Sequence, residues 1–262
     1  MSNYYWDEDK MKLDLATPTM MGIGDSWFWY VFRGGSLINN IGDIVESMGH
    51  ILLAKGMNGA EAYDYVDGKY ARSVKTALDL YGSNLAAVLI SGGGNDFAGF
   101  NDMRPLLKPT CSAETTAPGC FRTGPGGLED FMAHVDLYYR KLIGLIYTHT
   151  KPGCKIIMHT YDYSIPNGIG VFGSHGWLKP AMMDAGVPAQ LQQACVKFLL
   201  DAFYDVLDNI RKTDPKNLDI VDSRGTLLPN EWANELHPTG AGFKKIAYER
   251  WKPVLKKHGL AA

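Results

Sequence analysis

The 262-residue sequence lacks any long uninterrupted run of apolar residues. The longest runs, such as Leu85–Ile90, are far shorter than the roughly 20 residues that a membrane-spanning helix needs. The sequence also lacks an excess of either charge, because 26 basic and 28 acidic residues leave a net charge of -2. This balance gives no general attraction to nucleic acid or to anionic membranes. We therefore expect no integral membrane association and no nucleic-acid partner.

A secretory leader is also missing from the start of the sequence. Residues 1–15 are polar and acidic, with no basic stretch followed by an apolar one. A cytoplasmic location is therefore favoured, although a secreted chain whose leader had been removed would look the same.

Cysteine is scarce, and its four copies form neither a Cys-x-x-Cys pair nor a Cys/His spacing typical of a metal site. Cys111 and Cys120 lie in a stretch rich in Pro, Thr and Gly, where they could form a local disulfide or stay reduced. Cys154 precedes an apolar run and Cys195 lies in a helical pattern, so we expect buried free thiols at both positions.

The sequence does contain enough apolar residues, 46% of the chain, to form a substantial core. Short apolar runs alternate with longer amphipathic stretches, which is typical of an α/β protein with a parallel sheet. Five short runs flanked by Gly or Pro are predicted to be buried strands: Thr19–Ile23, His50–Ala54, Ala86–Ser91, Lys155–Thr160 and Leu218–Asp222. Apolar residues at spacings of three and four predict helices over Leu128–Thr150, Pro188–Arg211 and Gly240–Lys257.

Two long stretches, 97–127 and 161–188, break this alternation and are rich in Pro and Gly. Each follows a predicted strand, so each should leave the carboxyl edge of the sheet, where ligands of α/β folds bind. Because loops of this length are usually functional, we expect them to form the walls of an active-site cleft. No linker-like change in composition divides the chain, which predicts a single domain over residues 1–262.

Four polar or glycine-rich segments stand near the ends of predicted elements: Gly24-Asp25-Ser26, Gly56–Ala60, Gly92–Asp96 and Asn234–Thr239. They do not fit two common motifs. The nucleophile-elbow pattern G-x-S-x-G fails because Phe28 stands two residues after Ser26. The nucleotide-binding pattern G-x-G-x-x-G fails at Phe97.

In this order, the four segments resemble the sequence blocks of the SGNH hydrolase superfamily, also called the GDSL esterases and lipases. The resemblance extends from Gly24 to Gly242 and implies a flavodoxin-like α/β fold, a three-layer α/β/α sandwich with about five parallel strands. It implies a serine esterase or lipase that cleaves a small-molecule carboxylic ester through an acyl-enzyme, without metal or cofactor. A carbohydrate O-acetyl esterase is the alternative within the superfamily. A binding module with weakened catalysis is the alternative outside enzymes.

The resemblance also implies roles for particular residues. Ester hydrolysis needs a nucleophile, a base and donors for the oxyanion. Ser26 matches the nucleophile and His237 the base, for which we expect an ordinary pKa of about 6.5. The implied oxyanion donors are the backbone N–H groups of Ser26 and Gly59 and the side-chain amide of Asn95.

One position departs from the family pattern. Members usually carry aspartate three residues before the histidine, and this chain has Asn234 there. An amide oxygen can orient the imidazole by a hydrogen bond, but it cannot stabilise the imidazolium by charge. We expect Asn234 to orient His237, with Asp222, at the end of the fifth predicted strand, as the alternative. Glu235 is adjacent in sequence and could point away.

Overall fold

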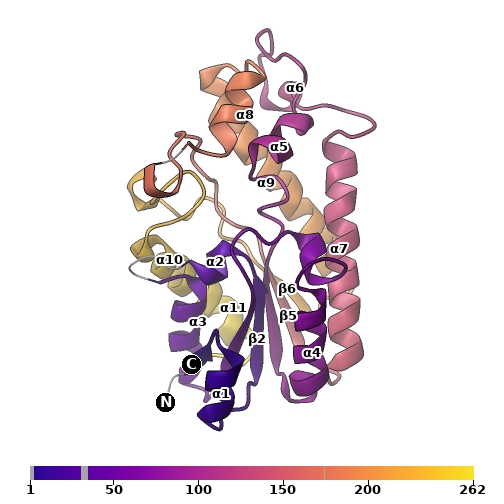
Figure 1. Cartoon of the computed structure of the whole chain (residues 1–262), viewed down its shortest axis with the longest axis vertical. Helices are drawn as coiled ribbons and strands as arrows, with labels where there is room; N and C mark the ends of the chain where they lie inside the picture. The colour runs from indigo at the N-terminus through magenta and orange to yellow at the C-terminus, as the bar shows by residue number, and fades with distance from the viewer. Residues whose placement is uncertain (1–2, 31–34, 174) are drawn as a thin grey trace.

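The computed structural model describes residues 3–30, 35–173 and 175–262, and within them a parallel sheet forms the centre of the molecule (Figure 1). Its six strands are β1 (Tyr4–Tyr5), β2 (Met20–Gly24), β3 (Leu52–Gly56), β4 (Ala87–Ser91), β5 (Lys155–His159) and β6 (Leu218–Val221). They lie in the order β1-β3-β2-β4-β5-β6. The five predicted strands are confirmed within two residues at each end, and the short β1 adds a sixth.

The position of β2 in this order decides where a ligand can bind. The chain passes from β2 to β3 on one side and later to β4 on the other, so the strand order reverses at β2. Gly24 at the end of β2 pairs in register with Gly56 of β3 and Ser91 of β4. The loops after these three strands therefore leave the same edge at the same level. In parallel α/β sheets this switch point is the usual ligand-binding crevice.

Helices cover both faces of the sheet, as its buried strands require. The helices of the described residues are α1 (Glu8–Leu13), α2 (Ser26–Trp29), α3 (Leu37–Glu46), α4 (Ala71–Tyr81), α5 (Phe100–Met103), α6 (Ala117–Cys120), α7 (Leu128–His149), α8 (Leu178–Asp184), α9 (Ala189–Arg211), α10 (Gly240–Ile246) and α11 (Lys252–Lys257). Helices α3, α10 and α11 lie on one side and α4, α7 and α9 on the other (Figure 1).

The three predicted helices are confirmed with small changes. Helix α7 buries Val135, Tyr139, Leu142 and Ile146, which follow the predicted spacing of three and four. The predicted helix over Gly240–Lys257 is continuous but contains a π-helical turn at Ala247–Trp251, between α10 and α11. Among the described helices, none combines the length and the apolar character needed to cross a bilayer.

The stretches 97–127 and 161–188 extend beyond the carboxyl edge of the sheet and contain the short helices α5, α6 and α8 (Figure 1). The prediction that these two stretches are long loops is therefore only partly right. Cys111 and Cys120 are both buried free thiols, and the Cys111 Sγ lies 3.4 Å from the Cys120 carbonyl oxygen. Cys154 and Cys195 are also buried and free, as predicted.

Candidate active site

Ser26 is the first residue of α2 and is separated from the end of β2, at the switch point, by Asp25 alone. Asp25 caps this helix, because its Oδ1 accepts the N–H of Trp27 at 3.0 Å. The Asp25 N–H donates to the carbonyl of Ser91 at 2.9 Å and ties the turn to β4. Gly24 is required here, since a Cβ would lie 2.7 Å from the same carbonyl oxygen. The Ser26 side chain is consequently presented at the edge of the sheet, and it remains partly exposed.

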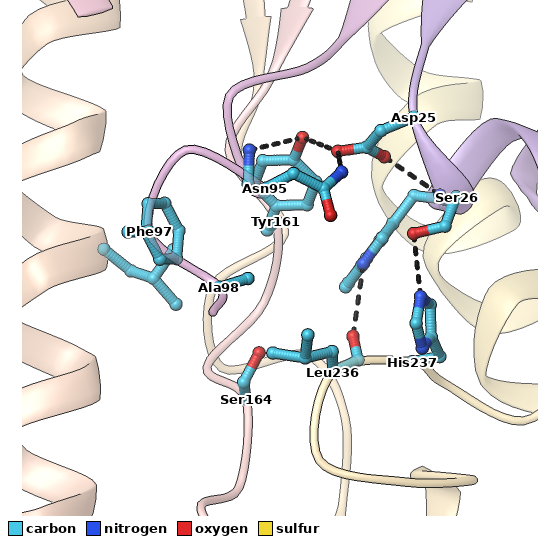
Figure 2. Close-up of a pocket in the computed structure, with 12 residues that line it drawn as sticks. Asp25, Ser26, Asn95, Phe97, Ala98, Tyr161, Ser164, Leu236 and His237 are labelled. Atoms are coloured by element: carbon cyan, nitrogen blue, oxygen red, sulfur yellow. Dashed lines mark hydrogen bonds between the residues drawn. The ribbon is translucent and has the colours of Figure 1, made fainter. Parts of the chain in front are cut away.

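His237 is brought to Ser26 by contacts on both sides of its loop. The indole N–H of Trp27 donates to the carbonyl of Leu236 at 3.2 Å, which joins α2 to the C-terminal segment. The loop itself is closed by the N–H of Ala233, which donates to the His237 carbonyl at 2.9 Å. In this arrangement the His237 Nε2 lies 2.7 Å from the Ser26 Oγ (Figure 2).

Asn234 is the residue that holds the other nitrogen of the imidazole. Its Oδ1 lies 3.0 Å from the His237 Nδ1 and accepts the N–H groups of Leu236 at 3.0 Å and His237 at 2.9 Å. Because these donors converge on one oxygen, the proton of the neutral imidazole belongs on Nδ1. The Nε2 is then free to accept the Ser26 hydroxyl proton. This geometry joins Ser26, His237 and Asn234 in one hydrogen-bonded row.

Aromatic rings enclose the imidazole. Tyr30 stacks on His237 with ring centroids 4.6 Å apart and planes 20° apart, and its hydroxyl accepts the Asn234 Nδ2 at 3.2 Å. Trp177 approaches from another side, edge-on at 5.9 Å. Burial lowers the pKa of His237 to about 4, below the value of about 6.5 expected from the sequence. His237 is therefore neutral, and able to accept a proton, over the whole neutral range.

Neither neighbouring carboxylate takes the place of Asn234. Asp222 forms a bidentate pair with Arg224, with bonds of 2.9 and 2.8 Å, so the alternative partner for His237 is occupied elsewhere. Glu235 points away from the imidazole into the stretch 161–188, where it accepts the N–H of Leu178 at 2.7 Å, of Lys179 at 2.9 Å and of Trp177. A carboxylate at the first turn of α8 is favourable, and it attaches this stretch to the segment that carries His237.

Asn95 and Gly59 lie on the other side of Ser26. Gly59 has a φ of +76° in an exposed turn, and no atom of the described residues lies within 4 Å of where its Cβ would be. The Asn95 Nδ2 donates to the carbonyl of Ala60 at 3.1 Å and, at a longer 3.3 Å, to the Asp25 Oδ2. Both amide hydrogens thus have partners in the structure. A contact between Asn95 and an oxyanion requires one of these hydrogens to be shared.

Tyr161 completes a buried network under Asn95. Its hydroxyl donates to the Asp25 Oδ2 at 2.6 Å and accepts the Gly94 N–H at 3.0 Å (Figure 2). Tyr161 adopts a φ of +64°, which is rare for a residue with a side chain. Burial raises the pKa of Asp25 to about 7. The network fixes the turn that presents Ser26, which agrees with a positional role for Asp25.

Two further histidines at this edge of the sheet, His159 and His175, do not belong to this row. His159 is fully buried between the hydroxyls of Ser91, at 3.1 Å, and Ser223, at 2.7 Å, and burial lowers its pKa to about 3. His175 is exposed. Within the described ranges, no three or more His, Cys, Asp or Glu side chains are grouped so that they could hold a metal ion.

Sequence reasoning did not single out Tyr161 or Trp177. The aromatic run Trp27–Tyr30 follows Ser26 directly, which indicates core packing with one or two rings lining the cleft, and Tyr30 is such a ring. Tyr161 follows β5 at the same edge as Ser26. Trp177 carried no comparable signal, because its approach to His237 depends on how residues 161–188 pack.

No protein-family model matches the sequence, and no curated protein matches it. Solved structures do match. Phospholipase A1 from Streptomyces albidoflavus NA297 is 14% identical with a TM-score of 0.50, and the match covers 93% of this chain and all of that chain. An active-site mutant of a family two carbohydrate esterase from Clostridium thermocellum is 11% identical with a TM-score of 0.51, covering 92% of this chain and 63% of that chain. An extracellular lipase from Streptomyces rimosus is 19% identical with a TM-score of 0.49, and the match covers 93% of this chain and 100% of that chain.

At these identities the likeness shows the fold alone. The chain shares the α/β fold of these solved structures, and the predicted fold class, an α/β/α sandwich with a central parallel sheet, is confirmed, with six strands in place of about five.

Proposed function

We propose that this protein is a serine hydrolase that cleaves carboxylic esters through an acyl-enzyme intermediate. The observation that carries the proposal is the hydrogen-bonded row from Ser26 through His237 to Asn234, with bonds of 2.7 and 3.0 Å. A nucleophile, a base and an orienting group in this relation are the parts that acyl transfer needs. The row opens onto a cavity of about 400 Å³ that Gly59 and Asn95 also line. The fold supports the proposal, because it places this row at the ligand-binding edge of the sheet.

In the first step, the Ser26 Oγ attacks the ester carbonyl carbon while its proton moves to the His237 Nε2. The imidazolium so formed keeps its Nδ1–H on Asn234 and lies on the face of Tyr30, whose ring attracts a cation. The tetrahedral intermediate collapses as the C–O bond to the alcohol breaks, and the alcohol oxygen takes the proton from Nε2. Water then gives a proton to Nε2 and attacks the acyl carbon. Collapse releases the acid and returns the proton to Ser26.

The oxyanion of both intermediates requires hydrogen-bond donors. Ser26 is the first residue of a helix, where N–H groups have no partner within the helix. The Gly59 N–H belongs to an exposed turn that borders the cavity. Asn95 can contribute by sharing the hydrogen that now makes the long 3.3 Å bond to Asp25. We assign these three donors to the oxyanion. Loss of any one of them should raise the activation free energy of hydrolysis by about 2.7–4 kcal/mol.

The test is covalent labelling with ethyl 4-nitrophenyl methylphosphonate, which traps a serine nucleophile in a stable tetrahedral form. We expect one 4-nitrophenolate released per chain, one phosphonyl group added by intact mass, and complete loss of esterase activity. Ser26→Ala should be folded, unlabelled and inactive. Ser112→Ala, at an exposed serine away from the site, is the matched control and should be labelled like the wild type.

Two results would contradict the proposal. A Ser26→Ala variant with activity within about tenfold of wild type would show that another group is the nucleophile. A folded wild-type protein that neither reacts with the phosphonate nor cleaves any ester would favour the alternative of a binding module.

A further inference from the structure

Two cavities of very different size meet at Ser26 and His237. The first, here called the narrow pocket, has a volume of about 30 Å³ and is drawn in Figure 2. Its lining includes the reacting residues Ser26 and His237 together with Phe97, Ser164 and Leu200. Most of its wall is buried: Leu200 is 1%, Phe97 5% and Ser164 8% exposed. The narrow pocket is therefore a small recess whose walls are mostly buried side chains, although it is not sealed from solvent.

The second, here called the open cavity, has a volume of about 400 Å³ and shares Ser26, Asn95, Leu236 and His237 with the first. Its other lining residues are Tyr30, Asn58, Gly59, Val171, Phe172 and Trp177. Its rim is exposed, since Phe172 has 91% of its surface in solvent and Asn58 and Gly59 are also exposed. The open cavity therefore connects the reacting groups with bulk water and offers aromatic walls.

The chemistry of the proposed reaction decides which half of an ester each cavity receives. The alcohol must leave before the second step, and a water molecule must reach the position next to the His237 Nε2 that the alcohol has vacated. The wider cavity with the exposed rim permits this exchange more readily than the small recess with buried walls. The acyl group stays attached to the Ser26 Oγ through both steps, so it can occupy the small recess. The open cavity thus takes the alcohol and the narrow pocket takes the acyl group.

The volume of the narrow pocket limits the length of the acyl chain. One water molecule needs about 10–15 Å³ in this measure, so the narrow pocket holds about two groups of that size. The methyl of an acetyl group or the ethyl of a propionyl group fits this space. A longer chain has to displace Phe97 or Leu200, which are buried in the core. Close-packed walls of this kind resist enlargement.

We propose that the narrow pocket restricts the acyl group to about two or three carbons, so that the substrates are acetyl or propionyl esters of larger alcohols bound in the open cavity. This inference rests on the proposed ester hydrolysis and adds the class of substrate to it.

The first experiment compares 4-nitrophenyl acetate, butyrate and octanoate, with each kcat/KM divided by the rate of hydrolysis by hydroxide. We expect acetate to exceed butyrate by about tenfold or more, since two methylenes that do not fit a pocket carry at least this discrimination. Octanoate should be slower still. Equal or better hydrolysis of octanoate would overturn the inference, and this outcome depends on no variant.

The second experiment enlarges the narrow pocket with Leu200→Ala. The ratio of butyrate to acetate activity should rise by about tenfold, because the two added methylenes gain room. Leu207→Ala is the matched control: Leu207 lies two turns further along α9, is equally buried, and does not line either cavity. It removes the same atoms from the core, so its ratio should equal that of wild type. An unchanged ratio in a folded Leu200→Ala would place the acyl group elsewhere.

The third experiment tests the open cavity with two acetates of unactivated primary alcohols, ethyl acetate and 2-phenylethyl acetate. We expect kcat/KM to be about tenfold higher for 2-phenylethyl acetate, because its ring can lie against the aromatic walls. Phe172→Ala should reduce this advantage and leave the butyrate-to-acetate ratio unchanged. If Phe172→Ala changes the butyrate-to-acetate ratio and leaves the preference for 2-phenylethyl acetate unchanged, the assignment of the two cavities is reversed.

The failure of this inference can be told apart from the failure of the proposed function. Phosphonate labelling at Ser26 together with a preference for long acyl chains refutes only the assignment of the narrow pocket. Absence of both labelling and ester cleavage refutes the proposed function itself.

Discussion

Replacement of Asn234 by aspartate changes one group in the row and tests how the imidazolium is stabilised. In Asn234→Asp, the Oδ1 can keep its bonds to the His237 Nδ1 and to the N–H groups of Leu236 and His237. The second oxygen replaces an amide that donates to the Tyr30 hydroxyl at 3.2 Å. Because a phenol hydroxyl can donate as well as accept, this contact can reverse its direction. The geometry therefore allows the substitution with one added negative charge.

The magnitude follows from the change in the bond to Nδ1. A neutral hydrogen bond contributes about 0.5–1.5 kcal/mol net, and one to a charged group about 1.5–3 kcal/mol. The imidazolium thus gains about 1–2 kcal/mol, and one pKa unit corresponds to about 1.4 kcal/mol. The pKa of His237, which burial lowers to about 4, should rise by about one unit in Asn234→Asp.

The assay is the pH dependence of kcat/KM for 4-nitrophenyl acetate between about pH 3.5 and pH 8, read where both forms of the product absorb equally. Protonated His237 cannot act as the base, so activity falls as the pH drops through its pKa. The wild type should therefore lose half of its kcat/KM near pH 4, and Asn234→Asp about one pH unit higher. On the plateau, the better stabilised imidazolium should raise kcat by up to about tenfold.

Asn234→Ala serves as the control, because it removes the acceptor without adding charge. It should lower kcat on the plateau and should not move the acid limb upward. The reasoning is refuted if a folded Asn234→Asp has the same acid limb and the same plateau as wild type. That result would mean that the group at 234 has no electrostatic influence on His237.

Four further substitutions, at three positions, separate the roles of neighbouring groups. Asp222→Asn should leave kcat within about twofold of wild type, because Asp222 pairs with Arg224. A loss of kcat approaching the roughly 10⁴-fold seen when a triad aspartate is replaced would instead identify Asp222 as the partner of His237. Glu235→Gln removes the charge that accepts several backbone N–H groups, so the free energy of unfolding in urea should fall by about 1–3 kcal/mol, whereas an unchanged value would show that these bonds contribute nothing. Tyr30→Phe retains the stacked ring and should keep most of kcat, while Tyr30→Leu should reduce it by about three- to thirtyfold; equal values for the two variants would exclude a role of the ring.

The sheet and the long helices could be predicted from the sequence because their signals are local. Buried strands such as β4 are short apolar runs between glycine and turn residues, and α7 repeats its apolar residues at helical spacing. Strand β1 could not be predicted in this way, since two residues carry no alternation and pair only because β3 lies beside them. The short helices α5, α6 and α8 are likewise set by packing beyond the sheet edge, where no periodic pattern indicates them.

Some features of the site could likewise be predicted from the sequence, and others could not. Ser26 and His237 belong to recognisable sequence blocks, and the structure brings their side chains within 2.7 Å. Whether Asn234 or Asp222 meets the imidazole could not be decided from the sequence, because both belong to segments that reach the same edge of the sheet. The pair between Asp222 and Arg224 settles where that carboxylate lies in the structure. The lowered pKa of His237 arises from burial, which no single stretch of sequence encodes.

The amide of Asn234, in the place of a carboxylate, and the burial of His237 act in the same direction. Each disfavours the imidazolium, so the base stays unprotonated well below neutral pH, and each also makes it a weaker acceptor of the Ser26 proton. The stacked Tyr30 ring opposes this weakness only while the cation exists, in the transition state and the tetrahedral intermediate. A site built in this way exchanges some catalytic power near neutral pH for activity that persists in mild acid. The proposed esterase should therefore keep most of its kcat/KM at pH 5, where an unperturbed histidine with a pKa of about 6.5 would be almost fully protonated.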